Sequence, residues 1–300
     1  MAFVGPSPRT TNAYDVADFV TRHHDTYPLI SATTTNLAGR SVFVTGASKG
    51  IGRATAIRYA VAGCNQIAIG ARSALGEVEQ AIKDAAKEAG HPEPTVVSVV
   101  LDVISEDSVK AAADTISKAF DGKLDVLIAN AGYMDPWEPL AESDTTSWIT
   151  TLDTSLKGLY LCTRFFLPLL LKSELKTVLA VSSIGALLIS SGASSYQIAK
   201  FAACRFVECV DQDHHAEGII AIALHPGGVR TELGLNLPDS FHQLLIDTPE
   251  LPADHMVWLA KERREWLSGR FVFSNWDVAQ LEAKKDEIVE RNLLKFRMQI

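Results

Sequence analysis

The feature that most constrains the fold of this chain is a regular alternation of short apolar segments and segments with helical spacing, which begins at residue 41. The apolar segments are rich in aliphatic and β-branched residues, as is typical of strands that are covered on both faces. Their alternation with helices predicts an α/β fold, in which a parallel, doubly wound sheet carries helices on both faces. The seven expected strands are residues 41–45, 66–70, 95–101, 125–130, 177–183, 219–225 and 269–274.

The 300 residues are expected to form a single domain with an extension at each end. The N-terminal part lacks strand patterning and predicts a short helix over 15–24, on which His23 and His24 point in different directions and are expected to be solvated. A long helix is expected over 145–171, and a charged helix over 277–296. The expected divisions are an arm at 1–38, a domain at 39–274 with a substrate lid at about 231–261, and a helical tail at 275–300.

The charge and composition exclude several classes of partner. The net charge is -8 and there is no basic tract, so neither nucleic acid nor an anionic membrane surface is an expected partner. The most apolar run, residues 160–171, contains Arg164 and Pro168 and is too short to span a membrane. The four cysteines form no CxxC motif and have no zinc-like spacing with histidines. We therefore expect reduced, buried thiols, no metal site and a cytoplasmic location.

Two short motifs carry recognisable chemistry. The sequence TGASKGIG, residues 45–52, lies between the first expected strand and the first helix. Glycines there allow a tight turn and a close approach of a diphosphate to the helix N-terminus, which predicts nucleotide binding. The sequence SSYQIAK places Tyr196 and Lys200 four residues apart, on one face of a helix. Taken alone, such a pair is far more often an ordinary tyrosine and lysine on a helix surface.

Together these motifs resemble those of the short-chain dehydrogenase/reductase family. The glycine spacing T-G-x-x-x-G-x-G is followed, in the family's order, by NAG at 130–132, SSIG at 182–185 and HPGGVRT at 225–231. The resemblance covers about residues 38–231, together with GRFVFSNWD near the end of the chain. It implies a Rossmann-type fold and an oxidoreductase activity. The arm, the long lid and the NWD sequence are similar to those of reductases from fungal secondary metabolism.

The resemblance implies a role for each residue of a catalytic group. Tyr196 would exchange a proton with the substrate, and Lys200 would lower the pKa of the phenol and hold the nicotinamide ribose. Ser183 would hydrogen-bond the substrate oxygen and stabilise its developing negative charge. The family commonly has an asparagine that helps to keep a water in the lysine's proton relay, and Ser155 stands in its place. This serine either holds a water itself or leaves the relay to another route, and it keeps a non-redox use of the fold open.

The residues after the second expected strand favour NADP(H). NAD sites place an acidic residue about twenty positions after the glycines, whereas NADP sites offer an arginine. Here Ala71 occupies the acidic position and Arg72 follows, and Lys49 and Ser73 could also bind a 2′-phosphate. The alternative is that both cations are solvated. The cofactor-binding residues implied by the resemblance are Thr45, Gly46, Ser48, Lys49, Gly50, Ile51, Gly52, Arg72, Ser73, Asp102, Val103, Asn130, Ala131, Gly132, Tyr196, Lys200, Pro226, Gly227, Val229 and Thr231.

The substrate is less clearly indicated, and an apolar pocket for a small lipophilic or polycyclic ketone is expected. The leading hypothesis is an NADPH-dependent ketoreductase or alcohol dehydrogenase. The alternatives are a cyclase, isomerase or dehydratase on the same fold, and a non-catalytic protein with a nucleotide pocket. The intact Ser183, Tyr196 and Lys200 argue against the last. The candidate pocket residues, which could equally belong to the core, are Tyr133, Met134, Trp137, Leu187, Leu188, Leu235, Phe241 and Leu245.

A homodimer or homotetramer is also expected. The helices after the fourth and fifth strands have long apolar faces, and in the family that this sequence resembles such helices pair across a two-fold axis. The apolar residues of these helices include Leu159, Phe165, Phe166, Phe201 and Phe206.

Overall fold

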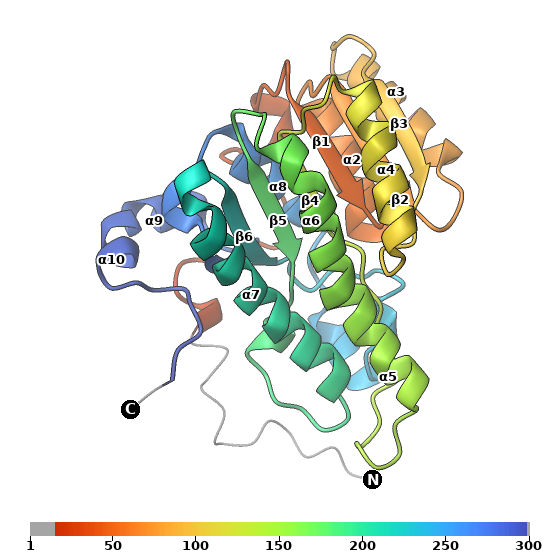
Figure 1. Ribbon diagram of the computed structural model, residues 1–300. Coiled ribbons are helices and arrows are strands. Elements are labelled where there is room, and N and C mark those ends of the chain that lie inside the picture. The colour runs from red at the N-terminus through yellow and green to blue at the C-terminus, as the bar shows by residue number, and fades with distance from the viewer. Residues whose placement is uncertain (1–15, 299–300) are drawn as a thin grey trace.

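A computed structural model describes residues 16–298, and its centre is one parallel sheet of seven strands (Figure 1). The strand order is β3-β2-β1-β4-β5-β6-β7, so the direction of winding changes between β1 and β4. The predicted α/β, doubly wound fold is confirmed. The strands are β1 (Ser41–Thr45), β2 (Gln66–Ala71), β3 (Thr95–Val100), β4 (Val126–Ala129), β5 (Thr177–Val181), β6 (Ile220–His225) and β7 (Arg270–Phe273).

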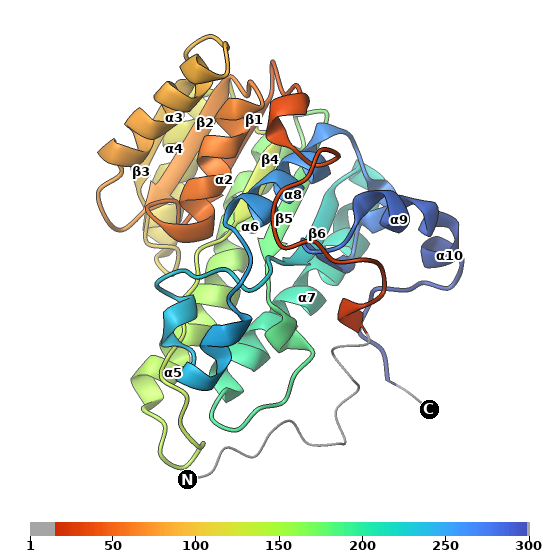
Figure 2. The same ribbon diagram turned by 180° about the vertical axis from the view of Figure 1, so that it is seen from behind.

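Helices cover both faces of this sheet. Helices α2, α3 and α8 are neighbours on one face, and α4, α6 and α7 lie on the other (Figures 1 and 2). The helices are α2 (Gly50–Val61), α3 (Gly76–Glu88), α4 (Glu106–Ala119), α5 (Thr145–Leu152), α6 (Gly158–Leu170), α7 (Ser194–His214), α8 (Glu250–Lys261), α9 (Val278–Ala283) and α10 (Lys285–Glu290). The short helical turns are η1 (Ala32–Thr34), η2 (Asp153–Lys157), η3 (Ile184–Ala186), η4 (His215–Glu217), η5 (Gly234–Asn236), η6 (Asp239–Leu244) and η7 (Glu265–Leu267).

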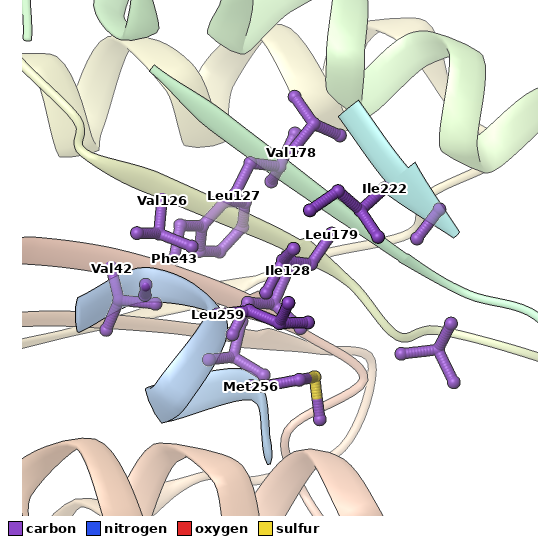
Figure 3. Close-up of a cluster of buried hydrophobic side chains, with 14 of the residues drawn as sticks. Val42, Phe43, Val126, Leu127, Ile128, Val178, Leu179, Ile222, Met256 and Leu259 are labelled. Atoms are coloured by element: carbon purple, nitrogen blue, oxygen red, sulfur yellow. The ribbon is translucent and has the colours of Figure 1, made fainter. Parts of the chain in front are cut away.

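The core lies between the central strands and the two helical layers. Every residue of β1, β5, β6 and β7 is buried, because helices cover both faces of these strands. Figure 3 shows Phe43 and Leu127 of the sheet together with Met256 and Leu259 of α8 in this core. The sheet edge at β3 is less covered, and Val100 there is 83% exposed. The central strands β1, β4, β5 and β6 are therefore well buried, and the motifs identified above lie at their carboxyl ends.

The helix predicted over 145–171 is interrupted by a wider, π-helical turn. Helix α5 leads directly into η2, a π-helix over Asp153–Lys157, and α6 continues to Leu170. A π-turn inserts one extra residue into the helical path and is frequent at functional sites. Ser155 lies in this turn and its side chain is buried.

The segment above the carboxyl ends of the strands is shorter than the lid predicted at about 231–261. Residues 231–249 form loops and the turns η5 and η6. The following helix α8 is part of the core, because all residues from Leu251 to Ala260 are buried against α2 and neighbouring elements. The prediction of a lid up to residue 261 is therefore wrong for α8.

The helix predicted over 15–24 is also wrong for the residues that the structure describes. Asp15 lies outside them, and only Val16 and Ala17 are helical. The segment instead follows the end of β7, where Arg22 pairs antiparallel with Trp276. The Trp276 indole donates a hydrogen bond to the carbonyl oxygen of Ala17 at 3.0 Å. These contacts bind the segment's polar groups to a distant part of the chain instead of to a helix.

The tail forms two short helices, α9 and α10, rather than the single helix predicted over 277–296. After α10 the chain turns back at Leu294, whose φ of 63° is left-handed. The carbonyl oxygen of Leu294 accepts a hydrogen bond from the Phe271 amide at 2.9 Å, and the Phe296 ring packs on Phe271. The tail therefore covers the outer edge of β7, which a continuous helix could not do.

The cysteines only partly match the expectation of buried thiols. Burial raises the pKa of Cys64, Cys162 and Cys204 to about 12 in each case. Cys209 is exposed on α7, and that part of the prediction is wrong. Within residues 16–298, no helix is long and apolar enough to cross a membrane.

Candidate active site

Ser183 and Tyr196 meet where β5 ends and α7 begins. Ser183 lies two residues after the end of the strand, and its hydroxyl oxygen accepts a hydrogen bond from the Gly185 amide at 3.0 Å. Tyr196 lies in the first turn of α7 and is half-buried. Burial raises the pKa of the Tyr196 phenol above its ordinary value of 10.0, and a hydrogen bond with Ser183 opposes this rise. A serine hydroxyl and a phenol thus converge at one point of the sheet edge.

Lys200 lies one helical turn beyond Tyr196. Its Nζ is 5.6 Å from the centroid of the Tyr196 ring and donates a hydrogen bond to the carbonyl oxygen of Val181 at 2.9 Å. Burial lowers the pKa of Lys200 from 10.5 to about 8, and Cys204 opposes this shift. The sequence predicted that Lys200 lowers the pKa of Tyr196. In this arrangement burial outweighs every lowering effect on the pKa of the phenol, and the Lys200 ammonium group is hydrogen-bonded to Val181.

Ser155 faces a very small cavity beside these residues. Its hydroxyl oxygen is buried and has no hydrogen-bond partner among residues 16–298. Ser155 lines a cavity of about 10 Å³ whose walls also include Thr45, Val181 and Cys162. A volume of this size is close to the space that one buried water needs. The serine at the family's asparagine position therefore lies next to a space for about one water molecule.

The glycine-rich turn is held tightly against the end of β4. Thr45 Oγ1 accepts hydrogen bonds from the amides of Asn130 and Ala131, at 3.0 and 3.1 Å. The Asn130 side-chain amide donates to the carbonyl oxygens of Thr45 and Gly46, at 3.0 and 3.2 Å. A Cβ atom at Gly52 would lie 2.4 Å from the Gly46 carbonyl oxygen, so only glycine fits there. These contacts fix the predicted diphosphate turn at the N-terminus of α2.

The residues expected to bind a 2′-phosphate lie at the surface beside this turn. Arg72 and Ser73 directly follow β2 and are exposed, and Arg72 makes no ion pair within the described residues. Lys49 precedes α2, and its Nζ lies 2.5 Å from Glu232 Oε2. Lys49 is therefore paired with the segment after β6 and is not a freely solvated cation. The first turn of α2 and the free Arg72 guanidinium together fit an anionic group such as a phosphate.

The residues expected around the adenine and the nicotinamide ribose lie at the ends of β3 and β4. Asp102 is half-buried, and its carboxylate accepts a hydrogen bond from the Ile104 amide at 3.2 Å. Val103 is buried and packs closely against Gly158 of α6. A Cβ atom built on Gly158 would lie 2.7 Å from Val103 Cγ2. Gly132 is exposed, and a Cβ atom built on it would be 3.7 Å from Lys200 Nζ. The Lys200 ammonium group thus borders the backbone of the NAG motif.

The turn after β6, residues 226–231, completes this edge of the sheet. Gly227 has a φ of 94°, a conformation that favours glycine. Val229 is buried and pairs with Asp247, and Thr231 Oγ1 accepts a hydrogen bond from the Gly234 amide at 3.0 Å. A Cβ atom built on Gly50 would lie only 3.1 Å from the Thr231 methyl group, so this turn lies close to the glycine-rich turn. The predicted cofactor residues after β1 and β6 therefore face each other.

The loops around Tyr196 present an apolar rim. The Trp137 ring of the loop after β4 packs on the Phe241 ring of η6, with centroids 5.2 Å apart. Met134 is buried, and Leu235 is exposed. The large apolar side chains that are exposed on the loops after β4, β5 and β6 are Leu140, Ile189, Leu235, Leu244 and Ile246.

Three polar residues of this edge were not predicted as site residues. Asp135 is buried and accepts a hydrogen bond from Thr151 Oγ1 at 3.0 Å and another from the Ser195 hydroxyl. Asp247 is buried beside Gly228, and His24 is hydrogen-bonded to Asp247, so the prediction of a merely solvated His24 is wrong. Asp135 is the only charged residue of the otherwise apolar GYMDPW sequence, and this isolated charge could have indicated a functional or buried carboxylate. The contact between His24 and Asp247 spans 223 residues and has no local signature.

Comparison with known proteins gives a consistent result. A family model described as short chain dehydrogenase matches residues 40–240. The short chain dehydrogenase mpl6 of Monascus purpureus is 50% identical over 276 residues, which cover 92% of this chain and 94% of that protein. The short chain dehydrogenase pigC of Monascus ruber is 39% identical over 303 residues, which cover 97% and 99% of the two chains.

Solved structures show the same fold. An NADPH-bound carbonyl reductase from chicken fatty liver is 26% identical and superposes with a TM-score of 0.66, covering 79% of this chain and 97% of that one. A short-chain type dehydrogenase/reductase from Mycobacterium marinum has a TM-score of 0.70 at 22% identity, covering 82% and 97% of the two chains.

Proposed function

Since this chain belongs to the short-chain dehydrogenase family and is an oxidoreductase, we propose that it is an NADPH-dependent ketoreductase of a small lipophilic substrate. The observation that carries the proposal is the convergence of Ser183, Tyr196 and Lys200 at the carboxyl edge of the sheet. This edge, near the change of winding between β1 and β4, is where doubly wound folds bind their ligands.

Each of the three side chains has one task in the proposed reaction. Ser183 holds the substrate carbonyl oxygen and stabilises the negative charge that develops on it. Tyr196 donates its phenolic proton to that oxygen. NADPH, when bound, would supply the hydride to the carbonyl carbon. Lys200 would hold the cofactor's ribose hydroxyls and, with its ammonium group near the phenol, would favour the deprotonated form of Tyr196 after the proton has left.

The preference for NADPH over NADH rests on charge. Ala71 leaves no carboxylate to bind a ribose 2′-hydroxyl at the end of β2, and Arg72 beside it is exposed and free to bind a 2′-phosphate. Lys49 can add a second cation if it exchanges Glu232 for the phosphate. The carbonyl reductase from chicken fatty liver, a structural relative at 26% identity, was solved with NADPH, which supports the same choice.

After Tyr196 has donated its proton to the substrate, the phenol must take up a new proton before the next turnover. Lys200 Nζ is bonded to the Val181 carbonyl oxygen, and Val181 lines the same small cavity as Ser155. A water in that cavity would hydrogen-bond the buried Ser155 hydroxyl, which otherwise lacks a partner among the described residues. We assign Ser155 to this water-mediated relay, in the place of the family's asparagine.

The surroundings support a lipophilic substrate and self-association in the cytoplasm. The exposed aliphatic side chains on the loops around Tyr196 suit an apolar substrate surface. A second set of exposed apolar side chains on α5, α6 and α7 supports a homodimer or homotetramer. Four free cysteines support a reducing compartment. The second set consists of Ile149, Tyr160, Ile198 and Phe201.

The proposal is tested by following NADPH absorbance with a panel of aliphatic, aromatic and polycyclic ketones. We expect oxidation of NADPH with at least one lipophilic ketone, and a much lower rate with NADH at equal concentration. Faster turnover with NADH would contradict the cofactor assignment. Tight NADPH binding with no turnover on any ketone, aldehyde or alcohol would contradict the redox assignment.

A second candidate function is a non-redox reaction on the same fold, such as a cyclisation, isomerisation or dehydration. The observation that favours it is Ser155, which replaces an amide with a shorter hydroxyl in the expected proton path. The intact Ser183 and Tyr196 could then serve as an acid–base pair alone. The ketone panel separates the two candidates, because only the ketoreductase consumes NADPH.

A further inference from the structure

The turn after β6 is held by a buried carboxylate from a distant part of the sequence. Asp247 Oδ2 accepts a hydrogen bond from the Gly228 amide at 2.6 Å, and the Asp247 amide donates to the Gly228 carbonyl oxygen at 2.9 Å. A Cβ atom at Gly227 would lie 2.6 Å from the same Oδ2 atom. The carboxylate therefore fixes the backbone of this turn, and it requires glycine at position 227.

The other carboxylate oxygen is bound by the N-terminal segment. His24 Nδ1 lies 2.6 Å from Asp247 Oδ1, and the side chain of His24 is 51% exposed while that of Asp247 is 5% exposed. The Thr248 amide donates to the His24 carbonyl oxygen at 3.0 Å, and Thr248 Oγ1 donates to Asp25 Oδ1 at 2.6 Å. Both oxygens of Asp247 are thus occupied, and His24 closes the outer side of the pair.

The same segment reaches the helix of the glycine-rich turn. Thr26 Oγ1 donates to Asp254 Oδ2 at 2.5 Å, and Asp254 of α8 is completely buried. Arg58 of α2 binds both oxygens of Asp254, at 2.5 and 2.7 Å. Residues 24–26 therefore connect the turn after β6, through Asp247, with helix α2, through Asp254. These are the two elements that face each other across the candidate cofactor site.

We propose that His24 and Asp247 are positioning residues, which hold the turn after β6 in the conformation that binds the nicotinamide cofactor. The inference rests on the proposed function. Both residues lie outside the range 40–240 that matches the family model, so the family's common core does not contain this contact. The His24 side chain acts through the Asp247 carboxylate, and this carboxylate acts through the Gly228 amide. Cofactor affinity in this chain is thereby made dependent on the N-terminal segment.

The test measures the NADPH dissociation constant of the full chain by fluorescence titration for His24→Ala, Asp247→Asn and the double variant. His23→Ala is the matched control, because His23 belongs to the same segment but its side chain binds Asp277, at 2.9 Å, instead of Asp247. Loss of one charge-assisted hydrogen bond is expected to weaken NADPH binding about five- to tenfold in His24→Ala. His23→Ala should bind as the parent does. The double variant should be no weaker than Asp247→Asn alone, since the His24 side chain acts on the turn through the Asp247 carboxylate and the backbone contact of His24 is kept in every variant.

A second measurement does not depend on the cofactor. Hydrogen–deuterium exchange of the peptide that contains Gly228 should be faster in His24→Ala than in the parent, and unchanged in His23→Ala. If the parent binds NADPH and His24→Ala binds it equally well, the positioning role is wrong while the proposed function stands. Additive losses in the double variant, or equal losses in His23→Ala, would also overturn it. A parent that binds neither NADPH nor NADH would overturn the proposed function and this inference together.

Discussion

The Lys200 ammonium group donates a hydrogen bond to the carbonyl oxygen of Val181, at 2.9 Å. Val181 is the last residue of β5, and together with Ser155 it lines the cavity of about 10 Å³ beside β1 and β4. The lysine is therefore bonded to a group in the wall of the space that Ser155 faces. Because a carbonyl oxygen accepts hydrogen bonds but cannot pass on a proton, the proposed relay between Lys200 and Ser155 needs a route through a water in this cavity.

The first prediction concerns that route. Ser155→Ala removes the hydroxyl that would bind the water and should slow single-turnover NADPH oxidation by roughly tenfold or more. Ser155→Asn restores an amide at this position and should keep or raise the rate. The control is Thr163→Val, which removes a buried hydroxyl of the neighbouring helix α6 that has no partner within the described residues and does not line the cavity. If Ser155→Ala oxidises NADPH as fast as the parent does, the serine has no role in the relay.

The second prediction concerns cofactor selectivity. Arg72→Ala should weaken NADPH binding about ten- to a hundredfold and leave NADH binding nearly unchanged, because only NADPH carries the 2′-phosphate. Dissociation constants for both cofactors decide the matter. Arg291→Ala, which removes an equal charge just after α10, controls for the change in net charge. Equal losses for the two cofactors in Arg72→Ala would contradict the assignment.

The third prediction concerns stability in acid. His255 is completely buried, and burial, together with the charge of Arg264, lowers its pKa to about 3. In the unfolded chain its pKa is near 6.5, so only the unfolded state takes up this proton as the pH falls below that value. The contribution of His255 to stability is therefore present above pH 6.5 and is lost as the pH falls towards 3. By pH 5 the loss is about 2 kcal/mol.

Urea denaturation of the parent and of His255→Phe at pH 7, 6 and 5 tests this effect. The variant, with no imidazole to protonate, should lose about 2 kcal/mol less between pH 7 and pH 5. His215→Gln, a change at an exposed histidine, should keep the parent's dependence on pH. Identical slopes for the parent and His255→Phe would show that His255 does not stay neutral in the folded protein.

The fourth prediction concerns self-association. Ile198 of α7 is 49% exposed and lies with other exposed apolar residues of α5 and α6 on the face expected to pair. Ile198→Glu places a charge on this face and should convert the oligomer to a monomer in light scattering at micromolar concentration. Val100→Glu, at an exposed position of the edge strand β3, should leave the mass unchanged. A parent that is already monomeric would contradict the predicted oligomer.

The sequence was sufficient to predict the fold and the place of the motifs. Continuous apolar strands and a glycine-rich turn are local signals, and in a parallel sheet the chain order of the strands brings their carboxyl ends to one edge. Ser183 and Tyr196 could be located in this way because the first follows a strand end and the second lies in the first turn of the next helix, and Lys200 lies one turn further along that helix. The π-turn at Ser155 could not, since it depends on how α5 and α6 pack against the sheet.

Contacts between distant segments were beyond the reach of local patterns. The N-terminal segment was expected to be a solvated helix, yet His24 and Trp276 show that its polar groups are bound by residues near the other end of the chain. Likewise, the pKa of Tyr196 was expected to fall because Lys200 is four residues away. The spacing placed both on one helix face but did not reveal that the ammonium group is bonded to Val181.

The most direct test of the account is the rate of single-turnover NADPH oxidation by Tyr196→Phe, with the best ketone of the panel and with the NADPH dissociation constant measured alongside. Phenylalanine keeps the ring and removes the phenolic proton. We predict a rate lower by roughly two to four orders of magnitude, with NADPH binding close to that of the parent. A near-normal rate in Tyr196→Phe would contradict the claim that Tyr196 delivers the proton in this reduction.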